Sequence, residues 1–211
     1  MKKVLFIDVE TTGLDPRVHG IWQLAGLIEI DGEVADEFNY KMNVLEGDEV
    51  EDEALEVGGI TVDDLAKFDP PDMVFEHFKG ILEKAVDKFD KDDKMFVAGY
   101  NVHFDVDFLA NWYRALSEDK YGLGSFINWK KIDPLPVLHW LDYTAKLYLP
   151  NYKLQTVCER FGVPLEAHDA KSDIRATREL IIRIENKFHS VYDAWKKAGG
   201  NGETRNEDGQ S

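Results

Sequence analysis

The amino-acid sequence predicts an α/β domain built on a mixed β-sheet, and the order of its apolar patterns is the main reason. Three strand-like segments come first, followed by helix, strand, helix, strand and further helices. Asp31 and Gly32 separate the second and third strands, as is typical of a two-residue hairpin turn. The chain has 211 residues, enough for one domain with a sizeable core.

The individual elements follow from apolar spacing and from capping residues. Strands are expected at residues 2–10, 21–30, 34–43, 94–101 and 128–134. Thr61 caps a short helix, Pro70 and Pro71 open the next, and Asn101 is the expected N-cap of a third. These helices, and two shorter ones that follow, are expected at 61–68, 70–89, 102–118, 138–149 and 154–161. The third presents one apolar face, formed by Phe104, Phe108, Trp112 and Leu116.

The last helix has the clearest pattern. Its apolar residues advance by alternating threes and fours, which predicts one face on the core along its whole length. This seam consists of Ile174, Thr177, Ile181, Ile184, Phe188, Val191 and Trp195. Beyond Lys197 the chain is rich in glycine and polar residues, so we expect a domain of residues 1–197 and a disordered polar tail of residues 198–211.

Composition narrows the class of protein. The net charge of −16 argues against a broad electrostatic footprint for nucleic acid, but it leaves room for a small site where divalent ions reverse the local sign. The acidic stretches 45–56 and 87–94 are expected to be solvated surface. The single cysteine, Cys158, excludes an internal disulfide. With no signal-peptide pattern and no apolar run of membrane-spanning length, we expect a soluble, cytoplasmic protein without membrane contact.

Two carboxylates end the first strand. Asp8 and Glu10 are two residues apart, so both side chains leave the same face, at the carboxyl end where open α/β sheets form ligand crevices. Buried carboxylates are costly unless something offsets their charge, and a metal ion is the first candidate. The alternative is a strand end that simply opens to solvent.

Further acids and one histidine follow other elements. Asp105 is expected in the first turn of the third helix, whereas Asp107 would face water because side chains advance by about 100° per residue. His168 lies in a loop, and Asp173 projects from the first turns of the last helix. Asp169 shares the face of Asp173, but capping the helix would occupy its side chain. Taken alone, a histidine in a loop can also be interpreted as an ordinary surface residue.

In this order, the segments "DVETTGL", "NVHFD" and "HDAKSD" resemble the three motifs of the DEDDh-type 3′–5′ exonucleases. That family includes the proofreading epsilon subunit of bacterial replicative polymerases, ribonuclease T and oligoribonuclease. The resemblance covers about residues 3 to 185 and implies a ribonuclease H-like exonuclease fold, with a five-stranded mixed sheet whose second strand is antiparallel. It also implies that Asp8, Glu10, Asp105 and Asp173 organise two metal ions and that His168 is the general base.

The chemistry of these residues agrees with that implication. Carboxylates are hard oxygen donors suited to Mg²⁺ or Mn²⁺, and two such ions can hold the attacking and leaving oxygens of a phosphoryl displacement. By resemblance, the terminal nucleotide would meet the residues of the first motif, Ile60 and the start of the third helix: Thr11, Thr12, Leu14, Ile60, Asn101, His103 and Phe104. Asn101, His103 and Phe104 have equally good readings as a cap, a surface histidine and a core aromatic. One departure is Gly58, where epsilon-like proteins tend to carry a polar or basic residue.

The expected function is a metal-dependent 3′–5′ exonuclease that releases nucleoside 5′-monophosphates from single-stranded DNA ends. The alternatives are an exoribonuclease of the same family and a catalytically idle domain that binds a polymerase or a nucleic-acid end. Single-stranded nucleic acid is the expected partner, with DNA favoured over RNA, and a DNA polymerase is a second candidate partner. Lys171, Arg175 and Arg178 are the nearest cations in sequence, although a solvated helix face explains them equally well.

Overall fold

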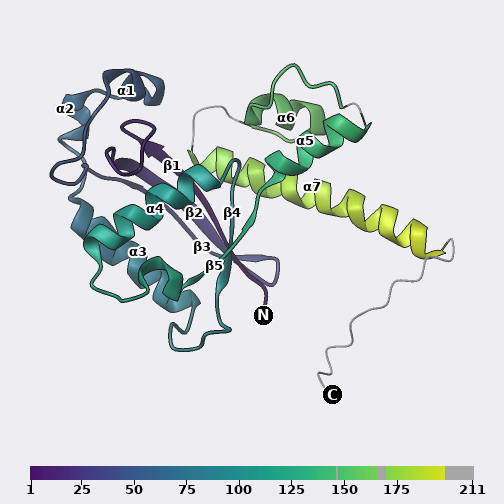
Figure 1. Cartoon of the computed structure of the whole chain (residues 1–211), viewed down its shortest axis with the longest axis horizontal. Coiled ribbons are helices and arrows are strands. Elements are labelled where there is room, and N and C mark those ends of the chain that lie inside the picture. The colour runs from purple at the N-terminus through teal and green to yellow at the C-terminus, as the bar shows by residue number, and fades with distance from the viewer. Residues whose placement is uncertain (146, 166–169, 198–211) are drawn as a thin grey trace.

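The computed structural model describes residues 1–145, 147–165 and 170–197, and a five-stranded sheet in the order β3-β2-β1-β4-β5 forms its centre (Figure 1). The strands are β1 (Lys3–Thr11), β2 (Ile21–Ile30), β3 (Glu33–Lys41), β4 (Met95–Ala98) and β5 (Ile127–Ile132). β2 is antiparallel to β1 and β3, whereas β4 is parallel to β1 and β5 to β4. The expected mixed sheet is therefore confirmed. Asp31 and Gly32 form its hairpin turn, with φ values of 51° and 91°.

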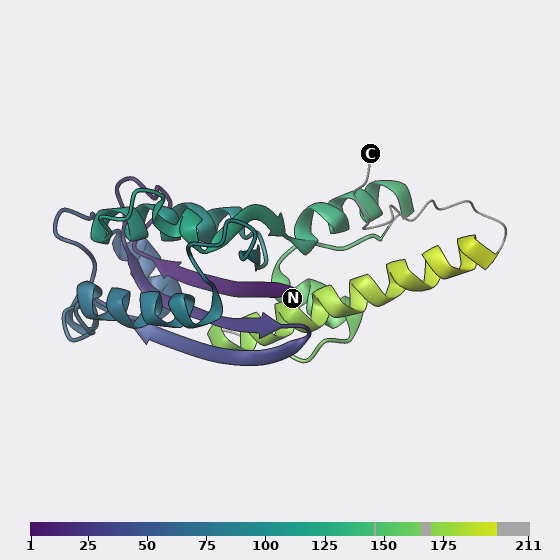
Figure 2. The ribbon, with the colours of Figure 1, turned by 90° about the horizontal axis from the view of Figure 1, so that it is seen from below.

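Helices cover both faces of this sheet (Figure 2). They are α1 (Asp52–Gly58), α2 (Val62–Leu65), α3 (Pro71–Ala85), α4 (His103–Leu116), the 3₁₀ turn η1 (Gly122–Ser125), α5 (Pro134–Ala145), α6 (Leu154–Phe161) and α7 (Ala170–Lys197). On one face Leu5 and Ile7 of β1 share a core with Phe108 of α4, and α3 joins the same core. On the other face Phe6 packs with Ile174 of α7.

This alternation positions the first two acids. Successive side chains of a strand point to opposite faces, so Asp8 and Glu10 lie on the same face as Phe6, toward α7. Val9 lies with Leu5 and Ile7 on the face covered by α3 and α4. The sheet thus presents two carboxylates to one helix layer while the other layer closes the main core.

The seam expected along the last helix is only partly buried. Ile174, Thr177 and Ile184 are buried, and α5 and α6 pack against the middle of α7 through a smaller apolar cluster. Beyond Ile184 the helix extends past the sheet (Figure 1). Phe188, Val191 and Trp195 expose 41%, 65% and 46% of their surface. The prediction of a core-facing seam is therefore wrong for this part of α7. Leu141 of α5 and Phe161 of α6 line a small pocket together with Phe188 and Val191, so α5 and α6 cover this part only incompletely.

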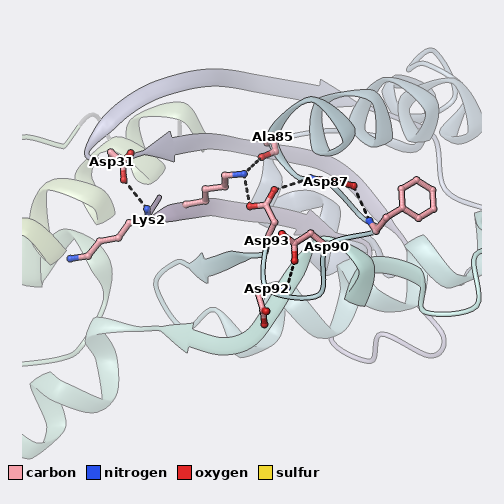
Figure 3. A network of polar contacts seen from close by, with 9 residues as sticks. Lys2, Asp31, Ala85, Asp87, Asp90, Asp92 and Asp93 are labelled. Carbon is pink, nitrogen blue, oxygen red and sulfur yellow. Dashed lines mark hydrogen bonds and ion pairs between the residues drawn. The ribbon is translucent and has the colours of Figure 1, made fainter. Parts of the chain in front are cut away.

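The connection from α3 to β4 also differs from expectation. α3 ends at Ala85 rather than continuing to residue 89, and a buried lysine helps to fix that end (Figure 3). The Nζ atom of Lys3 donates to the Ala85 carbonyl at 2.7 Å and lies 2.5 Å from the Asp93 carboxylate. Asp93 in turn accepts from the Asp87 backbone at 2.9 Å. The acidic stretch 87–94 is thus not merely solvated surface.

The starts of α2 and α4 differ in how well they match the sequence prediction. Thr61 caps α2 in a reciprocal capping box with Asp64, as expected. Asn101 is not the N-cap of α4, because it takes a left-handed conformation with φ 60° and the helix begins only at His103, after Val102. The second half of the acidic stretch 45–56 belongs to α1, whose Leu55 packs on Trp22.

Some expectations concern residues that the structure does not describe. The proposed tail, residues 198–211, lies outside the described residues, as does His168. Among the described helices, none combines the length and the apolar character needed to cross a bilayer.

Candidate active site

Asp105 joins helix α4 to the first strand. β4 ends at Ala98, which pairs with Phe6, so the part of β1 beyond Phe6 has no paired residue on β4. Asp105 supplies an acceptor there, since its buried Oδ1 accepts from the backbone N–H of Val9 at 2.9 Å. That N–H lies between Asp8 and Glu10. The bond therefore anchors the acidic end of β1 and brings a third carboxylate beside it.

Asp173 brings the fourth carboxylate from α7. It is the fourth residue of that helix, and its neighbours Ala170 and Ile174 pack on Phe6 and on Ala25 of β2. Asp8 faces Asp105, Glu10 and Asp173 closely enough for each charge to act on it. The structure thus gathers in one region all four acids that the sequence singled out from three separate segments.

Burial makes this gathering costly for a protein without counter-ions. It raises the pKa of the Asp8 carboxyl well above its usual range, and the charges of Asp105, Glu10 and Asp173 raise it further. Burial also raises the pKa of Asp105 to about 7, although the hydrogen bonds from Val9 and from its own N–H act in the opposite direction. Bound cations would relieve both effects.

The donor set fits divalent ions of the Mg²⁺ type. All four side chains offer carboxylate oxygens, which are the preferred ligands of hard cations. Within the described ranges, no three acidic, histidine or cysteine side chains already surround a common point. The carboxylates share a region and would have to close on an ion from the positions they take here.

Asp107 behaves as expected. It lies two residues after Asp105 on α4 and is exposed, whereas Asp105 is 4% exposed. His168 and Asp169 lie outside the described residues, so their expected roles as base and cap stay predictions.

Thr12 has a structural role in place of the expected contact with substrate. Its side chain is fully buried and donates to the Glu49 carbonyl at 2.7 Å, while its backbone N–H donates to the Gly20 carbonyl at 3.0 Å. The backbone bond closes the turn of residues 11–20, and the side-chain bond joins that turn to Glu49, so both groups are occupied. The expectation that the Thr12 amide meets the terminal nucleotide is corrected accordingly.

His19 supports this same turn. A Cβ atom on Gly13 would lie 2.3 Å from the His19 ring, so only glycine fits above the imidazole. Nδ1 lies 3.1 Å from the backbone nitrogen and 3.2 Å from the carbonyl oxygen of Asp15, and Nε2 lies 3.2 Å from the Glu51 carboxylate. No motif marks His19, because its partners come from the turn itself and from a distant segment.

The other expected substrate residues differ in accessibility. Leu14 is 80% exposed at the tip of the turn, and the Thr11 hydroxyl donates to the Gly13 carbonyl at 2.7 Å. Ile60 is half-buried against the cluster around Trp22. The departure at Gly58 has a packing reason, since a Cβ there would approach the Trp22 ring to 2.5 Å.

Three more of the expected substrate residues lie just before and at the start of α4. Asn101 and His103 are exposed, and Phe104 is half-buried against Phe108, with 4.8 Å between ring centroids. The backbone N–H of Asn101 donates to Asp133 at 3.1 Å, and Asp133 also accepts from Leu135 at 3.0 Å. Asp133 follows β5 and precedes Pro134, an N-cap signal that could have been recognised in the sequence.

Lys171, Arg175 and Arg178 are the cations nearest to the third motif in sequence. The two arginines among them bind the side of the sheet formed by β2 and β3. Arg175 makes two hydrogen bonds to the Glu37 carboxylate, at 2.9 and 2.8 Å. Arg178 contacts Glu29 at 2.6 Å and the Gly32 carbonyl at 2.9 Å. Both arginines therefore help to fix α7 on β2 and β3, and neither is retained as a candidate contact for phosphate.

Comparison with known proteins agrees with this geometry. Residues 5–181 match the family model described as Exonuclease (RNase_T), and the chain belongs to this family of enzymes. The resemblance to DEDDh-type 3′–5′ exonucleases is thereby confirmed.

The relatives that match in sequence are much longer proteins. The DNA polymerase III PolC-type of Thermotoga petrophila is 28% identical over 188 residues, which cover 88% of this chain and 12% of the relative. The protein of the same name from Streptococcus pneumoniae is 32% identical over 194 residues, with coverages of 88% and 12%. The chain thus spans about an eighth of the length of these relatives.

The solved structures that match support the fold. Escherichia coli exonuclease I in complex with a dT13 oligonucleotide superposes with a TM-score of 0.72 at 21% identity, over 92% of this chain and 43% of that chain. The zinc-bound form of the same enzyme with single-stranded DNA gives 0.73 at 19% identity, over 93% and 43%. The expected ribonuclease H-like exonuclease fold is confirmed.

Proposed function

We propose that this chain removes nucleotides from the 3′ end of single-stranded DNA by metal-dependent hydrolysis, releasing nucleoside 5′-monophosphates. The observation that carries the proposal is the gathering of Asp8, Glu10, Asp105 and Asp173 at the end of β1. These are the four positions at which the resemblance to DEDDh exonucleases expects acids. A domain that only binds nucleic acid would have no need for four mutually repelling carboxylates.

Divalent ions are part of this proposal, with Mg²⁺ or Mn²⁺ as the ions and the four carboxylates as their ligands. When bound, two such ions supply charge stabilisation for the attacking and leaving oxygens of an in-line phosphoryl displacement. Asp8 is proposed as the shared ligand, because it lies on the central strand and faces the other three acids. Asp105 keeps that strand end in place through Val9.

The remaining roles are proposed for His168 and for the expected neighbours of the terminal nucleotide. We propose His168 as the general base, since a neutral imidazole can take the proton of the attacking water near neutral pH. Leu14 is proposed to pack against the terminal base, and Thr11, Ile60, Asn101, His103 and Phe104 are retained as candidate neighbours of the terminal nucleotide.

DNA is favoured over RNA as the substrate because of the named relatives. The two relatives named above are DNA polymerases, and the two exonuclease I structures hold single-stranded DNA. A polymerase partner and a cytoplasmic location belong to the same proposal.

The test is a digestion of 5′-labelled single-stranded DNA and RNA oligonucleotides of one sequence, with Mg²⁺, Mn²⁺ or EDTA. The expected result is a ladder that shortens from the 3′ end, faster on DNA, and is absent in EDTA. Faster digestion of RNA would favour the exoribonuclease alternative, and tight binding without cleavage in either ion would favour the idle binding domain.

A further inference from the structure

A groove lies beside the turn of residues 11–20, which carries Leu14. It has a volume of about 790 Å³ and lies between the turn, the outer surface of α4 and Trp129 of β5. Leu14 and Arg17 line it from the turn, and Arg114 lines it from α4. We propose that this groove carries the nucleotides that precede the 3′ end, with Trp129 as a stacking platform. This inference rests on the proposed function and adds the path of the strand upstream of the cleaved bond.

Continuity with the active site is the first argument. Leu14 is the residue proposed to pack against the terminal base, and the same side chain forms one end of the groove. A strand whose last base lies against Leu14 therefore has the groove directly beside it. The occupant we propose is the chain of nucleotides already attached to the bound end.

The placement of Trp129 is the second argument. The pairing of β4 with β5 is regular up to Phe96 and Asn128 and resumes at Val97 and Lys131, which leaves Trp129 and Lys130 as extra residues in β5. Such bulges redirect side chains and are frequent near functional sites. Trp129 is 53% exposed and lines the groove. An indole held at a rigid strand is suited to stacking on a nucleic-acid base.

The charges of the groove favour a single strand bound by stacking. Arg17 is paired with Asp15 through two hydrogen bonds, at 3.0 and 2.7 Å, and Arg114 donates to Asn111 at 3.2 Å. Asp107 adds a second negative charge. The lining thus carries two positive and two negative charges. We therefore expect contacts between these arginines and DNA phosphates to contribute little to the affinity. The bases of a single strand are free to stack on protein, unlike those of a duplex.

The experiment compares Trp129→Ala with Trp140→Ala, a control on α5 with a similar exposed fraction of 56%. Each variant is assayed with a 12-nucleotide single strand and with the p-nitrophenyl ester of thymidine 5′-monophosphate, which has no upstream nucleotide. We expect Trp129→Ala to lower kcat/KM on the oligonucleotide about 5- to 30-fold and to leave the ester unchanged. The dissociation constant for the oligonucleotide in Ca²⁺ should rise by a similar factor. Trp140→Ala should change neither.

Three results would overturn the inference. Trp129→Ala could cleave the oligonucleotide as fast as the wild type, or it could lose activity equally on both substrates, which places its effect at the cleaved nucleotide. A change of oligomeric state without a change in DNA affinity would identify a second copy as the occupant. If the wild type cleaves neither substrate, the proposed function itself fails, and that result is distinct because it needs no variant.

Discussion

At the scale of single residues, the candidate site depends on hydrogen bonds to the backbone as well as on its four acids. Asp8 and Glu10 could be predicted from their spacing, because alternate residues of a strand share a face. The bond from Val9 to Asp105 could not, because it depends on β4 ending at Ala98. The support of Gly13 by His19 was missed for the same reason, since it is set by tertiary contacts.

The support by His19 leads to the first prediction. His19→Ala should lower kcat/KM on single-stranded DNA by about tenfold, because the turn that presents Leu14 loses the ring beneath Gly13 and the bonds to Asp15 and Glu51. The assay is run well below the melting temperature of the variant. His189→Ala, a change at an exposed position of α7, is the matched control and should be neutral. Equal activity of the two variants would show that His19 does not position the turn.

At the scale of elements, the strands were predicted closely and helix ends less well. The ends of α3 and α4 depend on distant partners, Lys3 for Ala85 and Asp133 for the loop at Asn101. The pattern of α7 predicted its existence but not its burial, because apolar spacing shows which residues share a face and not whether another element covers it. The chain continues as a helix beyond the layer formed by α5 and α6.

The link between Lys3 and Asp93 gives the second prediction. Asp93→Ala should lower the free energy of unfolding by about 1–3 kcal/mol, because it leaves a buried ammonium with only the Ala85 carbonyl as its partner. Asp92→Ala, at an exposed position in the same loop, should change it by less than about 0.5 kcal/mol. Urea unfolding of both variants measures the difference, and equal midpoints would contradict the role given to this ion pair.

At the scale of the whole molecule, a chain of net charge −16 concentrates four acids in one region. The match to three short motifs predicted this because hydrolysis with divalent ions needs carboxylates, whatever the overall charge. His168, the proposed general base, lies outside the described residues. Composition alone could not have located the site.

The third prediction concerns pH and ions together. Asp105 has a pKa of about 7 in the folded protein and an ordinary one near 3.8 when unfolded, so between these values the folded state binds more protons. The stability of the ion-free protein should therefore fall as pH rises from about 4 to 7, and Asp8 acts in the same direction. In Asp105→Asn, which keeps an acceptor for Val9, this dependence should be weaker.

Bound divalent ions should restore the stability that the ion-free protein loses as the pH rises. Mn²⁺ at about 100 times its dissociation constant should add about 2.7 kcal/mol, or roughly 5–10 °C in Tm, and the gain should be larger at pH 8 than at pH 5. Thermal unfolding in EDTA and in Mn²⁺ across this range provides the measurement. A gain that is independent of pH, or that Asp105→Asn retains in full, would argue against ion binding at these carboxylates.

The most direct test of the central claim is the rate of 3′ shortening of 5′-labelled single-stranded DNA in Mg²⁺ by Asp8→Asn and Asp173→Asn. Each change removes one carboxylate while keeping the size of the side chain, so the rate should fall by orders of magnitude with the fold retained. Asp72→Asn, an exposed change on α3, should cleave at the wild-type rate. An Asp8→Asn variant with a near wild-type rate would contradict a site built on the four carboxylates.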